Sequence, residues 1–236
     1  MGKRILKVIF RVFLVLTIIV TAYFGYNFIQ YQRIKDDRPI ETLVDDIRNN
    51  PDFLTVDEIS EKFLDALVAT EDRRFYDRKG FDFRALARSI VTNIKEGEFV
   101  QGGSTIPQQV GKLLYFDHDQ DLNEKVIQVY IMYDLESLYS KDEILELYVN
   151  SIYFGSGYTG IKQASEGYFD SSALDLSWAE STLLAGIIPA PSVYDPTINF
   201  DLAKDRQYAV LLSLQDTGVI NEDQAERIYN TPLVIY

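Results

Sequence analysis

The feature that most constrains the fold of this chain is a largely apolar run, residues 12–32, that carries no charged side chain. About 20 apolar residues are enough for an α-helix to cross the hydrocarbon core of a bilayer. Four basic residues precede the run within residues 1–11, and all three of its tyrosines lie in its last ten residues. Basic residues stay on the cytoplasmic side of a membrane helix, and tyrosines favour the lipid–water interface. We therefore predict a cytoplasmic tail, residues 1–11, a single-pass anchor in the cell membrane, residues 12–32, and an extracytoplasmic remainder.

A cleaved signal peptide is the alternative interpretation of the same run. The apolar run is long for a signal peptide, and Val20-Thr21-Ala22 only weakly resembles a cleavage site. We therefore favour an anchor that is not removed.

The charge is distributed unevenly along the chain. Residues 1–35 hold six of the 23 basic side chains, so residues 36–236 hold 17 basic and all 36 acidic ones, a net charge of −19. Such a domain repels nucleic acid, which we exclude as a partner. The chain has no cysteine, which excludes disulfides, thiolate metal sites and a cysteine nucleophile. The single histidine, His118, lies among aspartates, and we expect it in an exposed loop.

Helix-start signals recur after the anchor, whereas strand signals are almost absent. Capping boxes are predicted at Thr55–Glu58, at Ser140, at Ser177 and at Asn221. Residues 121–138 are typical of a long helix. The spacing of the apolar residues from Phe83 to Ile94 is typical of an amphipathic helix. We predict a polar connector over residues 33–54 and one mainly α domain over residues 55–236.

Residues 101–112, Gln-Gly-Gly-Ser-Thr-Ile-Pro-Gln-Gln-Val-Gly-Lys, join a glycine-rich turn to a helix start. Ser104 stands where an N-cap is expected, and Pro107 fits only the first turn of a helix. One helical face would then hold Thr105, Gln108 or Gln109, and Lys112. Free N–H groups beside hydroxyls, amides and an ammonium group suit a polyanionic, hydroxyl-rich ligand. A polar helix face without a ligand is the alternative.

A second polar stretch, residues 71–82, directly follows an apolar helical run, residues 63–69. Its first residue, Glu71, is a carboxylate at the end of a buried helix. Such a group is a candidate for a raised pKa and for general-base catalysis.

In order along the chain, these stretches resemble the motifs of the peptidoglycan glycosyltransferases, glycosyltransferase family 51. The family pattern is Glu-Asp-x-x-Phe-Tyr-x-His-x-Gly, Gly-Gly-Ser-Thr-Ile-Thr-Gln-Gln and Arg-Lys-x-x-Glu, followed by Glu-Leu-Tyr-Leu-Asn and Ala-Pro-Ser-x-Tyr-x-Pro. The resemblance runs from about Val56 to Gly218. It implies a lysozyme-like, two-lobed fold and the polymerisation of lipid II, a disaccharide-pentapeptide on undecaprenyl pyrophosphate, into glycan strands with inversion.

The resemblance also implies roles for individual residues. Glu71 matches the family's base, and Gln128 stands at the position of its second glutamate. The implied substrate-binding residues are Asp72, Arg73, Phe75, Gly103, Ser104, Thr105, Gln108, Gln109, Lys112, Glu124 and Lys125. The implied partners are lipid II, the growing glycan strand, the lipid bilayer and other cell-wall synthases. A divalent cation, magnesium or manganese, is the only candidate cofactor.

Three departures from the family pattern are important. Arg78 replaces the histidine of the first motif, Glu124 replaces the arginine of the third, and Gln128 replaces its glutamate. Glutamine can neither transfer a proton nor carry a charge. Three interpretations therefore remain: an active transglycosylase, which we favour, an impaired member that binds lipid II or glycan and regulates other synthases, and a lysozyme-like hydrolase.

Overall fold

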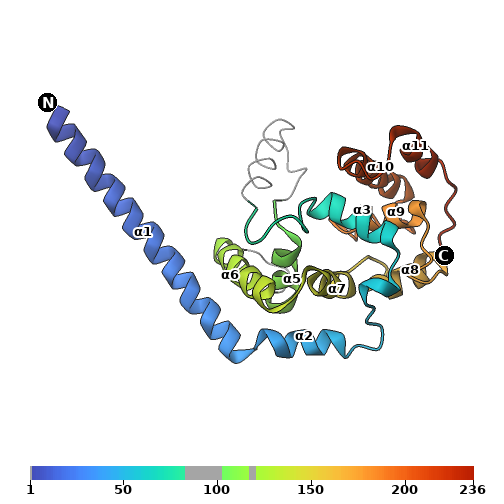
Figure 1. Ribbon diagram of the computed structural model, residues 1–236, viewed down its shortest axis with the longest axis horizontal. Coiled ribbons are helices and arrows are strands. Elements are labelled where there is room, and N and C mark those ends of the chain that lie inside the picture. The colour runs from blue at the N-terminus through green and yellow to red at the C-terminus, as the bar shows by residue number, and fades with distance from the viewer. Residues whose placement is uncertain (1, 83–102, 117–120) are drawn as a thin grey trace.

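The computed structural model describes residues 2–82, 103–116 and 121–236 (Figure 1). Within these ranges the regular elements are helices, and the only strand-like pairing is an isolated antiparallel bridge between Tyr153 and Thr159. The prediction of a mainly α fold is therefore confirmed. The predicted amphipathic helix from Phe83 to Ile94 and the loop at His118 lie outside the described residues.

The N-terminal helix, α1 (Gly2–Asp37), is unbroken and is long and apolar enough to cross a membrane. Its N-terminal half stands away from the rest of the chain (Figure 1). Apolar side chains from Ile5 to Ile29 are exposed along it, as expected of a surface that faces lipid. The helix continues past residue 32, where the anchor was predicted to end, and the buried side chain of Tyr31 shows that this part packs on protein. Helix α2 (Ile40–Arg48) occupies the predicted connector.

The remaining helices form two groups, which we call the first and second lobes. The first lobe holds α5 (Ile106–Tyr115), α6 (Leu122–Leu138) and α7 (Lys141–Ser151), with α1 packed on α6. The second lobe holds α3 (Glu61–Glu71), α9 (Trp178–Ile187), α10 (Phe200–Asp216) and α11 (Glu222–Tyr229). The short helix α8 (Ile161–Phe169) packs against α7.

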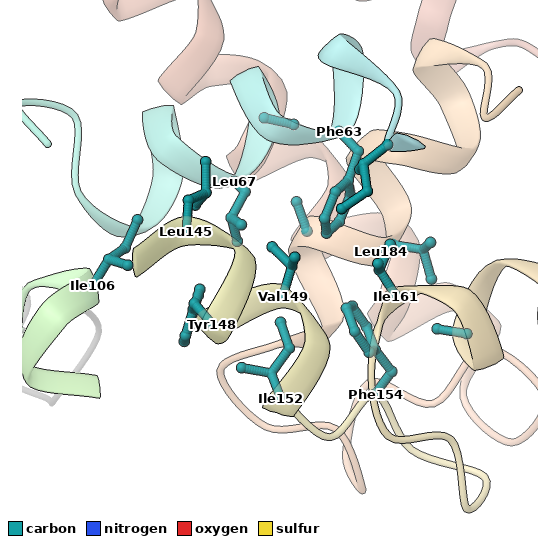
Figure 2. Close-up of a cluster of buried hydrophobic side chains, with 14 of the residues drawn as sticks. Phe63, Leu67, Ile106, Leu145, Tyr148, Val149, Ile152, Phe154, Ile161 and Leu184 are labelled. Carbon is teal, nitrogen blue, oxygen red and sulfur yellow. The ribbon is translucent and has the colours of Figure 1, made fainter. Parts of the chain in front are cut away.

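Helix α7 lies at the centre of the apolar core that joins the two lobes (Figure 2). Its Leu145 and Val149 lie near Phe63 and Leu67 of α3, and all four side chains are fully buried. Burying a large aliphatic or aromatic side chain stabilises a fold by about 1.5–3 kcal/mol. This core therefore holds the ends of α3 and α5 in a fixed relation to each other.

Most of the predicted helix starts are confirmed. The side chains of Asp121, Ser140, Ser177 and Asn221 accept hydrogen bonds from the first turns of α6, α7, α9 and α11. The capping box predicted at Thr55–Glu58 is also present, but it starts only a 3₁₀ turn, η1 (Val56–Glu58), and not an α-helix. The chain then becomes extended, since Ser60 hydrogen-bonds through its backbone N–H and its hydroxyl to residues just before α9.

Candidate active site

Glu71 is the last residue of α3, and its carboxylate lies between the two lobes. It keeps part of its surface open although protein atoms surround it on most sides. Burial raises the pKa of Glu71 above its ordinary value of 4.5, while a hydrogen bond from Gln109 and the positive charge of Arg206 lower it, and nearby Asp72 raises it slightly. Burial is the largest of these effects, so the carboxylate is a stronger base than an exposed glutamate.

A chain of hydrogen bonds across three helices holds this carboxylate in place. The hydroxyl of Tyr148 on α7 donates to Gln109 Oε1 at 2.8 Å, and Gln109 Nε2 on α5 donates to Glu71 Oε2 at 2.7 Å. Burial and the charge of Glu71 raise the pKa of Tyr148 well above its ordinary value, so this hydroxyl remains a donor. Because Tyr148 occupies the amide oxygen, the amide nitrogen of Gln109 is directed at the base.

The N-terminus of α5 is fixed by residues that were predicted to bind substrate. Asp72 Oδ2 accepts from the backbone N–H of Ile106, the first residue of the helix, at 3.2 Å. The N-cap is Thr105, not Ser104 as predicted, because Gln108 Oε1 accepts from the backbone N–H of Thr105 at 3.0 Å and completes a capping box. The side chains of Thr105 and Gln108 are buried, so the structure gives both a structural role. Substrate contact by either stays a prediction.

Arg78, which replaces the family histidine, is buried in an ion-pair network. Its guanidinium donates to both carboxylate oxygens of Asp72, to the carbonyl of Gly80 at 2.5 Å and to Glu136 Oε1 at 3.1 Å. Lys141 also donates to Glu136, at 2.7 Å. All of these contacts lie inside the protein, so Arg78 braces the loop after Glu71 and is not available as a substrate-binding cation.

Phe75 and Arg73, which belong to the same motif as Glu71, lie in different surroundings. Phe75 is fully buried, with the Lys141 ammonium 4.7 Å from its ring centroid, which gives it a packing role beneath the loop. Arg73 is directed away from the base, toward Asp216 at the end of α10, with a closest nitrogen–oxygen distance of 3.8 Å. The structure therefore does not bring Arg73 together with the other predicted site residues.

The predicted cations of the first lobe do lie together. Lys125 Nζ on α6 donates to Ser104 Oγ at 3.0 Å, immediately after Gly103 and just before α5 begins. Burial lowers the pKa of Lys125, and the positive charge of Lys112 on α5 lowers it further. Two ammonium groups that repel each other in a partly buried place suit a ligand with more than one negative charge.

The two altered positions of the third motif lie on α6, one helical turn apart. Gln128 is only 1 % exposed, and its Nε2 has no hydrogen-bond partner among the residues that the structure describes. The buried Oε2 of Glu124 is likewise unpartnered within that part of the chain. A buried polar group without a partner is costly, which points to a group that a ligand or a change of rotamer satisfies.

A divalent cation in this site would need ligands from the substrate in addition to those of the protein. Across the described ranges, no three acidic or histidine side chains gather in a way that could hold a metal ion. Magnesium is commonly held by one or two carboxylates together with substrate phosphates. The unpartnered oxygen of Glu124 fits that mode of binding.

Arg206 on α10 is a residue whose place in the site the sequence did not indicate. Its positive charge acts on Glu71, and its guanidinium carbon lies 5.4 Å from the ring centroid of Tyr194. Its Nε is buried and lacks a partner among the residues described. No local motif marks this position, and only the packing of α10 on α3 brings it near the base.

Comparison with known proteins shows which proteins this chain is similar to. Residues 36–215 match the family described as Transglycosylase. The chain is 34% identical over 197 residues to penicillin-binding protein 4 of Bacillus subtilis (strain 168), covering 84% of this chain and 31% of that protein. It is 39% identical over 176 residues to penicillin-binding protein 1F of the same organism, covering 75% and 25%.

A protein of a different organism gives a similar match. Penicillin-binding protein 1A of Aquifex aeolicus (strain VF5) is 37% identical over 183 residues, covering 78% of this chain and 25% of that protein. The chain therefore spans between a quarter and a third of the length of these three relatives.

Proposed function

This chain belongs to the transglycosylase family of peptidoglycan glycosyltransferases, and from that premise we propose that it polymerises lipid II into glycan strands at a membrane. The sugar hydroxyl of one substrate attacks the anomeric carbon of the growing strand. A carbon–oxygen bond forms there while the bond to the lipid pyrophosphate breaks, with inversion. The observation that carries the proposal is a partly buried, oriented carboxylate in one lobe and a pair of lysines in the other.

Glu71 takes the proton of the attacking hydroxyl. A sugar hydroxyl is a poor nucleophile at neutral pH, so a base must remove its proton as the attack proceeds. The Tyr148–Gln109–Glu71 chain holds the carboxylate in one orientation, and burial raises its pKa, which increases its basicity. The proton ends on Glu71, and the electron pair of the broken bond leaves with the pyrophosphate.

Lys112 and Lys125 bind the leaving pyrophosphate. Negative charge grows on the leaving group in the transition state, and preorganised cations stabilise it. The lowered pKa of Lys125 and its hydrogen bond to Ser104 show a lysine held by its surroundings. A divalent cation, if bound by Glu124 and the phosphates, would supply further neutralisation of that charge.

We propose that the polymerising domain lies on the outer side of the cell membrane. The basic residues before the apolar run of α1 support this orientation, and the exposure of apolar side chains along the helix supports its place in a membrane. Growing glycan strands and other cell-wall synthases are then the partners expected on that side.

A second candidate function is lipid II or glycan binding without catalysis. It is favoured by Gln128, a buried amide where the family has a glutamate, and by Glu124, which adds a negative charge next to Lys125 in the chain. Such a protein would hold substrate for other synthases.

Incubation of purified full-length protein with lipid II separates the two candidates. If Glu124 compensates for the altered motif, wild type makes polymer, Glu124→Ala lowers the rate and Gln128→Glu changes it little. If the chain is an impaired binder, wild type makes little polymer and the double variant Glu124→Arg with Gln128→Glu raises the rate sharply. A wild type that polymerises and is indifferent to all of these changes would show that α6 does not face the reaction.

A further inference from the structure

We propose that the membrane helix is a positioning element of the site: its packing on α6 holds the two lysines at a fixed height above the bilayer. We call this contact the α1–α6 seam, and it comprises Phe28, Tyr31 and Lys35 of α1 with Tyr130 and Asp134 of α6. The inference rests on the proposed function, because it concerns the binding of a lipid-linked pyrophosphate.

The seam combines apolar, aromatic and charged contacts. Tyr31 is only 3 % exposed, and its ring stacks on that of Tyr130 with centroids 5.7 Å apart. Phe28 packs edge-on against Tyr130 at 5.4 Å. The Tyr31 hydroxyl and the Lys35 ammonium both donate to Asp134 Oδ2. A partly exposed ion pair alone contributes little to stability, but one that shares a carboxylate with a buried tyrosine has a defined geometry.

Further hydrogen bonds connect the end of the membrane helix to both helices that carry the lysines. The hydroxyl of Tyr130 on α6 donates to the carbonyl of Phe24 at 3.1 Å. The hydroxyl of Tyr115, the last residue of α5, donates to the carbonyl of Arg38, just after α1 ends, at 2.7 Å. Lys112 and Lys125 therefore lie on helices that are each hydrogen-bonded to α1 or to the residue that follows it.

Such an arrangement matters only for a substrate that the bilayer also holds. The pyrophosphate of a lipid-linked sugar stays near the headgroup plane because its lipid chain is embedded. A loosely tethered domain would sample many heights and tilts, and an ordered one avoids that entropic cost at each binding event. A misplacement of about 1 Å at a reacting group can lower a rate by roughly 10²-fold.

The seam itself can be tested without activity, because the chain has no cysteine. Phe28→Cys with Tyr130→Cys should react with a short thiol–thiol crosslinker in vesicles. Tyr26→Cys with Tyr130→Cys is the matched control, since Tyr26 is two residues away on the helix and 56 % exposed. We expect crosslinking of the first pair at least several-fold above the control. Equal yields would overturn the proposal.

The positioning role is tested with Asp134→Ala in full-length protein in vesicles. We expect the KM for lipid II to rise at least about threefold, with kcat within about twofold and the melting temperature unchanged. Asp134→Asn should recover part of the loss, because its amide oxygen still accepts from Tyr31. With a water-soluble, short-chain lipid II in detergent, Asp134→Ala and wild type should be equal, since no bilayer fixes the phosphate.

The exposed Asp201→Ala, on α10, removes the same charge elsewhere and should behave as wild type. An unchanged KM for Asp134→Ala, or an equal loss with the soluble substrate, would contradict the positioning role. A wild type that makes no polymer would defeat the proposed function instead. In that event the crosslink and the affinity for vesicles that contain lipid II still decide whether the seam positions the lysines.

Discussion

At the scale of single residues, Glu71 is held in a state that favours reaction over stability. Protein atoms surround its carboxylate on most sides, which disfavours the charged form, and Gln109 and Arg206 offset only part of that effect. A folded-state pKa above the unfolded one means that the folded chain binds more protons across that interval. Stability therefore falls as pH rises through the folded pKa, and the destabilising effect is complete above it.

Replacement of Glu71 by glutamine should show this effect directly. Near neutral pH we expect Glu71→Gln to unfold at the same or a higher denaturant concentration than wild type, because no buried charge remains. The difference should shrink below the ordinary pKa of about 4.5, where the carboxyl group of wild type is protonated. Urea midpoints at several pH values measure it, and a variant that is clearly less stable at pH 7 would contradict the buried, raised-pKa description.

Tyr148→Phe should leave the base in place but less well oriented. Without the hydroxyl, the Gln109 amide can turn away from Glu71, which removes a bond that lowers the pKa of the base. A neutral hydrogen bond of this kind contributes about 0.5–1.5 kcal/mol, so we expect a loss of roughly 2- to 10-fold in rate. The acidic limb of the pH–rate profile should move to higher pH. Tyr208→Phe, on the exposed face of α10, is the control, and identical profiles for the two variants would exclude this role.

At this scale the sequence indicated Glu71 and Gln109, but it did not indicate the residues from other helices that act on them. Tyr148 stands at the tyrosine of the Glu-Leu-Tyr-Leu-Asn motif, but its side chain is buried and is reached only from inside the fold. The position of Arg206 depends on how α10 packs, and no spacing in the sequence encodes that packing. The polar side chains of a motif can be predicted, whereas partners from distant helices require the tertiary structure.

At the scale of elements, the loop after α3 and the start of α5 form one unit. Asp72 accepts from the first turn of α5 and from Arg78, and Arg78 also contacts Glu136 on α6. The substitution of arginine for the family histidine therefore adds a buried connection between three elements.

Removal of that connection should destabilise the protein strongly. Arg78→Ala leaves the buried carboxylate of Asp72 without its main partner, and such a loss typically costs about 3–5 kcal/mol. Lys162→Ala breaks an ion pair with Asp52 whose side chains are each about one-third exposed, and it should unfold close to wild type. Denaturant titration compares the two. Equal midpoints would mean that the Arg78 network contributes no more than a surface pair.

Helix starts were the most predictable elements, because a cap depends on residues only three positions apart. The start of α3 was not, since Ser60 is held by residues just before α9, more than a hundred positions later in the chain. Similarly, Ser104 satisfies the local rules for an N-cap but instead accepts a hydrogen bond from Lys125, which leaves Thr105 as the cap. Local propensity fails where a distant partner competes for the same side chain.

At the scale of the whole molecule, the orientation of the chain in its membrane decides which substrates it meets. A protease added to intact protoplasts should remove the domain that follows α1, because the basic N-terminal residues are expected to remain inside. The same protease added after permeabilisation, and a cytoplasmic protein as a marker, control for lysis. Protection of the domain until permeabilisation would reverse the proposed topology.

The sequence predicted the mainly α domain and its anchor, because hydropathy and capping act locally. It did not predict that α1 continues beyond the apolar run and packs on α6. That contact depends on Tyr31 and Asp134, which are about a hundred residues apart and lie in no recognisable motif. Amphipathic pattern alone cannot show which face of a membrane helix meets a folded domain.

The measurement that tests the central claim most directly is glycan polymer formed from lipid II by three proteins in the same vesicles. They are wild type, Glu71→Gln and Glu61→Gln, the last on the exposed first turn of the same helix. Loss of a general base typically lowers a rate by about 10²–10⁴-fold. We expect polymer from wild type and Glu61→Gln, and a loss of this size for folded Glu71→Gln. Near-normal polymerisation by Glu71→Gln would contradict the assignment of the base.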